Sequence, residues 1–195
     1  MTRRLNLRAF RKNEDGLAAI EFALVLPLLV TIFLGSIAAF DVYRTAEELE
    51  ASSGVIADVI SRQVTTDNGE LNQVSDLFVA LTGAQSRARA EIRIRSVLGE
   101  LDDKGTPTPN DDEIRYKVEW EFDSVNGGTQ DVDSYITAAE VIPLSPGQSA
   151  LLVDTLVKDT ATFDYFGFGE QDFENSMQLS PRFTSRIVNS DYGGN

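Results

Sequence analysis

The sequence of 195 residues contains no cysteine and no histidine. Without cysteine there is no disulfide framework and no thiolate metal site, and without histidine there is no imidazole ligand and no Ser-His-Asp or Cys-His nucleophile. Catalysis by carboxylates or by lysine alone remains chemically open, but no residue pattern favours it. The sequence therefore predicts a protein that is not an enzyme and that uses no metal and no cofactor.

Basic residues are also scarce, and their placement is uneven. The chain has 17 Lys and Arg against 31 Asp and Glu, which gives a net charge of −14. Five of the basic residues and two of the acidic ones lie in residues 1–16, a balance of +3, which leaves 12 against 29, or −17, in residues 17–195. An acidic body argues against nucleic-acid binding, because phosphate recognition needs clustered Lys and Arg. A hydrophobic content of 42% indicates a folded core and not a disordered acidic tail.

One long apolar run follows the basic head. Residues 17–40 read LAAIEFALVLPLLVTIFLGSIAAF, in which only Glu21, Thr31 and Ser36 are polar. As a helix rising about 1.5 Å per residue, this run would span roughly 36 Å, enough to cross a hydrocarbon core of about 30 Å. Basic residues precede it and acidic residues follow it, so the positive-inside rule predicts a single pass with the N-terminus in the cytoplasm. We expect a leader at 1–16, a transmembrane helix at 17–40 and an exported domain at 41–195.

A cleaved secretory signal peptide is the alternative interpretation of this run. Ser36-Ile37-Ala38 resembles a small-x-small cleavage site, and cleavage there would release a soluble protein, conceivably an enzyme, that begins near Ala39. The apolar core of a signal peptide is usually about 7–15 residues long and does not normally carry a carboxylate. Length and Glu21 therefore favour a retained helix.

Glu21 is the residue of the run that needs an explanation. A charged side chain costs about 2.5–3.5 kcal/mol at the centre of a membrane helix on insertion scales, and less near an interface. One explanation is structural: Glu21 lies early in the run, where its carboxylate can reach the cytoplasmic headgroups. The other is functional, and it depends on Gly16, which stands five positions before Glu21 and directly before the apolar run.

The string Gly16-Leu17-Ala18-Ala19-Ile20-Glu21-Phe22 resembles the processing site of type IV prepilins and pseudopilins. In that group a membrane peptidase cuts after the glycine and leaves a glutamate at the fifth mature position, followed by an aromatic residue. The wider sequence is similar to the TadE-like family of tight-adherence (Flp) pilus assembly proteins. The positions that carry this resemblance are Gly16, Glu21, Phe22, Ala23, Leu24, Pro27 and Leu28.

The resemblance implies a minor pseudopilin of the inner membrane, with its C-terminal domain in the periplasm. It implies cleavage by a prepilin peptidase between Gly16 and Leu17, and roles in helix packing and processing for Glu21, Phe22 and Pro27. The expected partners are the membrane, the prepilin peptidase and other pilins and pseudopilins, with no small-molecule substrate. Two alternatives stay open: an unprocessed, single-pass periplasmic interaction module of the same pilus system, and a larger-class relative that keeps its N-terminus uncut.

Beyond residue 40 the patterns predict an α+β, pilin-like fold. Apolar residues at helical spacing extend the first helix to about Gln63, and a second short helix covers Leu71 to Leu81 and ends near Gly83. The spacing then changes to alternation, which predicts strands around residues 88–95 and 114–122. Further strands are expected after Pro146, over residues 161–168, and from about Met177 to Val188. Together these segments predict an antiparallel sheet of about four strands.

Two charged features of the body have competing interpretations. The arginines that alternate along 87–95 can pair with the glutamates of the next strand, or they can form an anion-binding stripe. The acidic loop over 102–113 can hold Ca²⁺, which takes six to eight oxygen ligands, but its spacing matches no EF-hand, and acidic loops are usually just solvated. We expect cross-strand pairs and a solvated loop.

Overall fold

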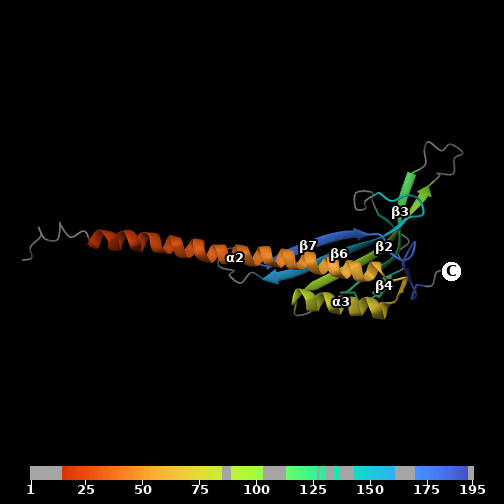
Figure 1. Ribbon diagram of the computed structural model, residues 1–195, viewed down its shortest axis with the longest axis horizontal. Coiled ribbons are helices and arrows are strands. Elements are labelled where there is room, and N and C mark those ends of the chain that lie inside the picture. The colour runs from red at the N-terminus through yellow and green to blue at the C-terminus, as the bar shows by residue number, and fades with distance from the viewer. Residues whose placement is uncertain are drawn as a thin grey trace, which may run out of the picture.

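The computed structural model describes residues 15–84, 89–102, 113–126, 128–130, 134–136, 143–160 and 170–192. A long helix, α2 (Asp15–Ser61), projects from a smaller body of sheet and helix (Figure 1). The other elements are β1 (Thr65–Thr66), α3 (Asn68–Thr82), β2 (Ala90–Asp102), β3 (Glu113–Asp123), β4 (Gly128–Gln130), β5 (Ser134–Ile136), β6 (Ser149–Thr160), β7 (Glu170–Leu179) and β8 (Val188–Asn189). The long strands lie in the antiparallel order β3-β2-β6-β7, and short β4 and β5 extend the sheet on β3. The predicted α+β class is confirmed.

Both helices begin and end close to where the sequence places them. The predicted first helix ends at Ser61, two residues before Gln63. At the start of α3 the side chain of Asp67 accepts a hydrogen bond from the backbone N–H of Glu70, at 2.8 Å, and so satisfies one of the free donors of the first turn. At its end Gly83 takes a left-handed conformation with φ 65°, which glycine adopts without steric cost.

The main core lies between one face of the sheet and the two helices. Its largest buried side chains come from α2, α3, β2, β3 and β6: Leu49, Ile56, Ile60, Leu71, Phe78, Ile92, Ile94, Trp120, Phe122, Leu151 and Val153. One polar contact crosses this interface, because the hydroxyls of Ser53 and Thr155 lie 2.7 Å apart. The same face of β7 is covered by α2, so the second half of α2 is itself a core element.

A β-bulge divides the apolar residues of β3 between two faces of the sheet. Simple alternation predicts that Tyr116, Val118, Trp120 and Phe122 share one face. The ladder shows instead that Ser96 pairs with Trp120 while the next residue, Val97, pairs with Val118, so β3 carries one extra residue at this point. An extra residue reverses the side-chain direction beyond it. Trp120 and Phe122 therefore enter the main core, whereas Tyr116 and Val118 enter a second one.

The second core covers the opposite face of the sheet at one end. It contains Val97, Tyr116, Val118, Leu144, Ala150 and Leu152, with Ile136 of β5 packed against it. Gly99 lets the turn at 144–147 approach: the N–H of Gly147 donates to the carbonyl of Gly99 at 2.8 Å. A Cβ on Gly99 would lie 2.8 Å from the carbonyl oxygen of Ser145. This glycine is required by the close approach of two backbones.

The C-terminal segment departs from the predicted strand over 177–188. The sheet strand β7 ends at Leu179, and the chain then crosses the end of α2, where the N–H of Arg182 donates to the carbonyl of Ser61 at 2.8 Å. Pro181 lacks an N–H and so cannot donate to a continued ladder. Beyond it Ile187 is fully buried, and its carbonyl accepts from the indole N–H of Trp120 at 2.8 Å. The last strand, β8, pairs in parallel with β1.

Two expectations cannot be followed through the fold. The predicted aromatic strand over 161–168 and most of the acidic loop, residues 103–112, lie outside the described residues. The loop is described only at its ends, where Asp102 closes β2 and Glu113 opens β3.

Two glycine-to-alanine changes are expected to have opposite effects on stability. Gly99→Ala should lower the free energy of unfolding by about 1–3 kcal/mol, because the new methyl group forces the turn at Ser145 away from the sheet. Gly54→Ala should raise it by up to about 1 kcal/mol, because Gly54 lies inside α2 and its nearest obstacle is the Met177 methyl group at 4.0 Å. Urea unfolding of the full chain in detergent, followed by the fluorescence of the single tryptophan, Trp120, measures both. Equal effects of the two changes would contradict the assigned packing.

Candidate functional site

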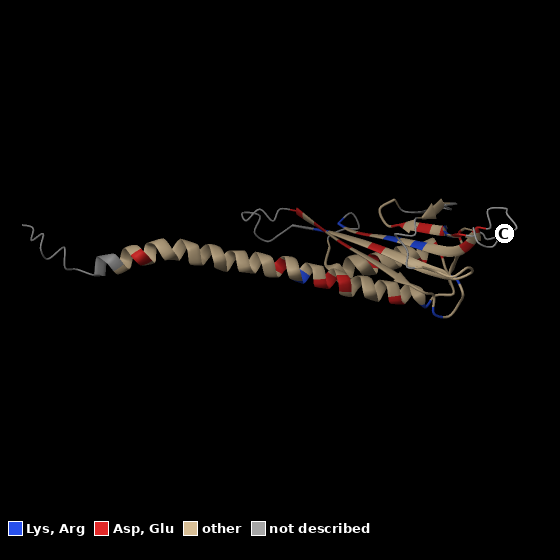
Figure 2. Ribbon diagram, turned by 90° about the horizontal axis from the view of Figure 1, so that it is seen from above, with Lys and Arg blue, Asp and Glu red and all other residues tan. Residues whose placement is uncertain are grey.

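The first half of α2 presents an apolar surface that nothing in the described structure covers. Only 6% of its most apolar 18-residue stretch is buried, whereas the core helix of a soluble protein would be mostly buried. Figure 2 shows an uncharged length of helix between the first red band of α2 and the charged positions where the sheet begins. By length and composition, one helix in the described part of the chain can cross a membrane. These features support single-pass membrane anchoring.

Glu21 lies on the exposed surface of this helix. Leu17 precedes it by four residues, so the backbone nitrogen of Leu17 stands about one turn, or 6 Å along the axis, from the level of Glu21. Among the described residues, none forms an ion pair with Glu21. Any side chain that compensates the Glu21 carboxylate therefore lies outside the described residues.

The expected processing site lies in the first turn of the helix. Gly16 and Leu17 directly follow Asp15, the first residue of α2. A peptidase cleaves extended backbone, so this turn has to unwind before the bond between them is cut. Glycine loses more than other residues when it enters a helix, which lowers the cost of that unwinding.

Pro27 lies inside α2 without ending it. Its ring removes one backbone donor, which a membrane helix tolerates when other groups satisfy the backbone. The hydroxyl of Thr31 donates to the carbonyl of Pro27 at 2.8 Å. The helix continues through Pro27 from Asp15 to Ser61, and the predicted role of Pro27 in packing stays a prediction.

A row of small residues on α2 was missed in reasoning from the sequence. Residues of this kind recur at every fourth position, with Pro27 in the gap: Ala19, Ala23, Thr31, Gly35 and Ala39. A Cβ on Gly35 would meet nothing within 4 Å, so the helix surface is open there. Small residues at this spacing let a second helix approach closely in a membrane. The four-residue period was the signal that could have revealed them.

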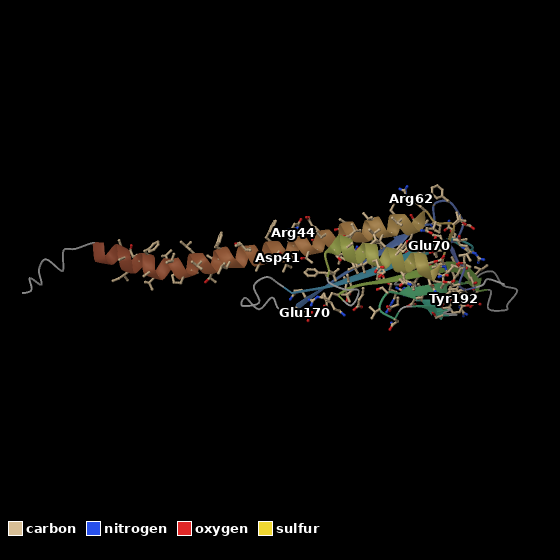
Figure 3. All side chains as sticks on the ribbon, turned by 90° about the horizontal axis from the view of Figure 1, so that it is seen from below. Asp41, Arg44, Arg62, Glu70, Glu170 and Tyr192 are labelled. Carbon is tan, nitrogen blue, oxygen red and sulfur yellow. The ribbon has the colours of Figure 1, made fainter. Side chains whose placement is uncertain are left out.

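Charged residues mark the place where the helix meets the sheet. Asp41 and Arg44 lie at this level (Figure 3), and the Nε of Arg44 is 2.6 Å from the Oε1 of Glu48. The phenol of Tyr43 donates to the carboxylate of Glu47, and this hydrogen bond raises the pKa of Tyr43 above its usual value. Pairs this exposed add little to stability. They place a polar boundary directly after residue 40.

The arginines of β2 are engaged in ion pairs with acidic neighbours. Arg93 lies 3.4 Å from Glu121 of β3, as the sequence predicts, whereas Arg95 pairs at 2.6 Å with Asp154 of β6 on its other side. Lys158 pairs with Glu91 at 2.5 Å, and the hydrogen bond to that carboxylate raises the pKa of Lys158. Glu91, Arg93, Arg95 and Asp154 line a cavity of about 560 Å³ on the face of the sheet turned away from the helices. Since each arginine already faces a carboxylate, an anion-binding stripe is disfavoured.

Metal binding has no support in the part of the chain that the structure describes. No group of three or more Asp or Glu side chains there is arranged to hold an ion. At the base of the acidic loop, Asp102 pairs with Arg115 at 2.5 Å. The Ca²⁺ hypothesis for the loop itself concerns residues outside the described ranges.

The comparison with protein families matches the apolar half of α2 and the boundary region. The model of the TadE-like protein family matches residues 16–51, which run from Gly16 past the charged boundary. Comparison with curated proteins and with solved structures finds no match. The resemblance to the TadE-like family, predicted from Gly16 to Leu28, is confirmed over residues 16–51. It connects the chain with tight-adherence pilus assembly.

A charge placed in the middle of the apolar helix is expected to prevent stable anchoring. Leu29→Arg should cost about 2.5–3.5 kcal/mol of insertion free energy, because Leu29 lies near the centre of residues 17–40. Val55→Arg is the matched control: Val55 is an equally exposed aliphatic residue of the same helix, at 48% against 53% for Leu29, but in its sheet-covered half. Alkaline extraction of membranes should release the Leu29 variant and leave the Val55 variant in the pellet. Retention of both would contradict the proposed span.

Proposed function

We propose that the chain is a minor pseudopilin that takes part in assembly of a tight-adherence pilus. Residues 17–40 anchor it in the inner membrane, residues 1–16 form a cytoplasmic leader, and residues 41–195 form a periplasmic domain. One observation carries the proposal: a carboxylate at Glu21, five residues after Gly16, within an exposed apolar helix whose sequence matches the TadE-like family. Its activity is association with other subunits and not catalysis.

Cleavage after Gly16 gives Glu21 a partner. It exposes the α-amino group of Leu17, one helical turn away, in the same helix or in a neighbouring subunit. A cation and a carboxylate that would each be costly in an apolar layer then compensate one another. Before cleavage, the basic leader sets the orientation of the helix in the membrane, and it is not needed for this purpose afterwards.

The continuity of α2 argues against a cleaved signal peptide. Cleavage near Ala39 would cut the helix in the middle, directly beside Ala38, which is fully buried. A released domain would begin inside this continuous helix, ten residues before Leu49, the first residue of α2 in the main core. The retained anchor therefore fits the fold better than a secreted soluble enzyme does.

The unprocessed membrane-anchored module remains the second candidate. It is favoured by the helical backbone at Gly16 and Leu17, which must unwind before any peptidase can act. In that case the leader stays attached, and Glu21 relies on the cytoplasmic interface for compensation.

The mass of the mature chain separates these two candidates. Expression together with a prepilin peptidase should shorten the membrane-extracted protein to a chain that begins at Leu17, and Gly16→Val should block this. Intact-mass spectrometry and N-terminal sequencing read the result directly. Retention of Met1 in the presence of an active peptidase would rule out processing.

Replacement of Glu21 is expected to separate insertion from assembly. Glu21→Ala should insert normally, because it removes a charge from the apolar run, yet reduce surface pili severalfold, because the α-amino group of Leu17 loses its partner. Glu47→Ala, which removes a carboxylate from the exposed part of the same helix, is the control and should leave piliation unchanged. Counting pili by electron microscopy and measuring membrane-bound protein gives both readouts. Normal piliation of the Glu21→Ala variant would contradict a role in assembly and would support the structural explanation, in which the Glu21 carboxylate only reaches the cytoplasmic headgroups.

A further inference from the structure

An exposed aromatic side chain lies on the bend that crosses the end of α2. Phe183 is 69% exposed, and Val64, in the turn after α2, is 56% exposed. Arg62, which is labelled in Figure 3, lies at the end of the body farthest from the apolar helix. Arg62 and Arg182 both bind the carboxylate of Asp58, at 2.8 and 2.6 Å. Two guanidinium groups share one carboxylate, so the cluster of Asp58, Arg62 and Arg182 carries a net positive charge.

The bend that carries Phe183 is held on both sides. The N–H of Arg182 donates to the carbonyl of Ser61 at 2.8 Å, and the hydroxyl of Ser149 donates to the carbonyl of Ser185 at 2.6 Å. Arg186 pairs with Glu119 of β3 at 2.8 Å. Phe183 is therefore presented to solvent by an anchored backbone, at low entropic cost for a contact. Exposed aromatic residues next to arginine are the usual centres of protein interfaces.

A recess of complementary character lies nearer the membrane, between α2 and the edge strand β7. It has a volume of about 350 Å³. Ala46, Leu49 and Phe173 form its apolar part, and the carboxylates of Glu50, Asp172 and Glu174 surround it. An apolar recess with an acidic rim fits an aromatic side chain that lies beside Arg182, because this arginine shares its carboxylate with Arg62.

We propose that Phe183 of one copy of this chain docks into the recess of a second copy, with Arg182 facing its acidic rim. The two surfaces differ, so the contact is head-to-tail, and repetition of such a contact builds an open chain of subunits. The recess at Leu49 and the end of α2 at Ser61 are separated by twelve residues, or about 18 Å along the helix. With the two helices parallel, the second copy is displaced by about 18 Å along the helix axis relative to the first.

The absence of cysteine makes the contact testable by site-directed cross-linking of the full chain in detergent. Ser185→Cys marks the bend, Asp172→Cys marks the recess, and Val125→Cys, on the turn after β3, is the control at an exposed position elsewhere. A short bismaleimide should join the first two variants into dimers when they are mixed, at least tenfold more than either variant alone. The Val125 variant should show background yield with both. A yield with Val125 equal to that with Asp172, or no mixed dimer at high protein concentration, would overturn the proposal.

A second pair of substitutions tests the side chain itself. Phe183→Ala in the bend variant should lower the mixed cross-link about tenfold, whereas Tyr135→Ala, a change of another half-exposed aromatic residue at 52%, should not. Unfolding followed by Trp120 fluorescence checks that both variants fold. An unchanged yield with Phe183→Ala would show that the ring does not occupy the recess. The test uses purified protein, so it can fail or succeed independently of the proposed role in pilus assembly.

Discussion

The packing of the outer half of α2 against the sheet is the contact on which the rest of the structure depends. Leu49, Ile56 and Ile60 bury their side chains among residues of β2, β3 and β6, and the hydroxyl pair of Ser53 and Thr155 lies in the same interface. The helix that fills this core is the same continuous helix whose first half is apolar and exposed. The folded body therefore moves with its anchor as one unit. A displacement of the anchor along the membrane normal is transmitted directly to the surface of the domain.

The C-terminal segment fixes the far end of this packed helix. It bonds to the last turn of α2 through Arg182, to Trp120 through the carbonyl of Ile187, and to the N-terminus of α3 through Asp191, whose carboxylate accepts from the N–H of Asn68 at 2.8 Å. The short parallel pair of β1 and β8 closes the same end. These contacts hold the bend at 182–186 as a defined surface, which is why an exposed phenylalanine there can serve as a specific contact.

Local patterns in the sequence predicted most elements of this fold, because the periodicity of a helix or a strand is visible within a short stretch of consecutive residues. The apolar run, the end of the second helix near Gly83 and the motif from Gly16 to Leu28 all depend on a few consecutive positions. The β-bulge between β2 and β3 could not be predicted, because it is a mismatch between two strands and leaves the alternation of β3 intact. The recess beside β7 was equally hidden: Leu49 and Phe173 are brought together only by the docking of α2.

The axial geometry of α2 decides how the charge at Glu21 can be compensated. Within one chain the nitrogen of Leu17 lies about 6 Å from the level of Glu21 toward the cytoplasm. Between two copies offset by about 18 Å, the Leu17 nitrogen of the outer copy would lie about 12 Å beyond the Glu21 of the inner copy, too far for an ion pair. The neighbour that receives Phe183 therefore cannot also neutralise Glu21. If the α-amino group of Leu17 compensates Glu21, it does so within the same chain or in a different neighbour at an offset of about 6 Å, and the charge and the aromatic contact then act on separate interfaces.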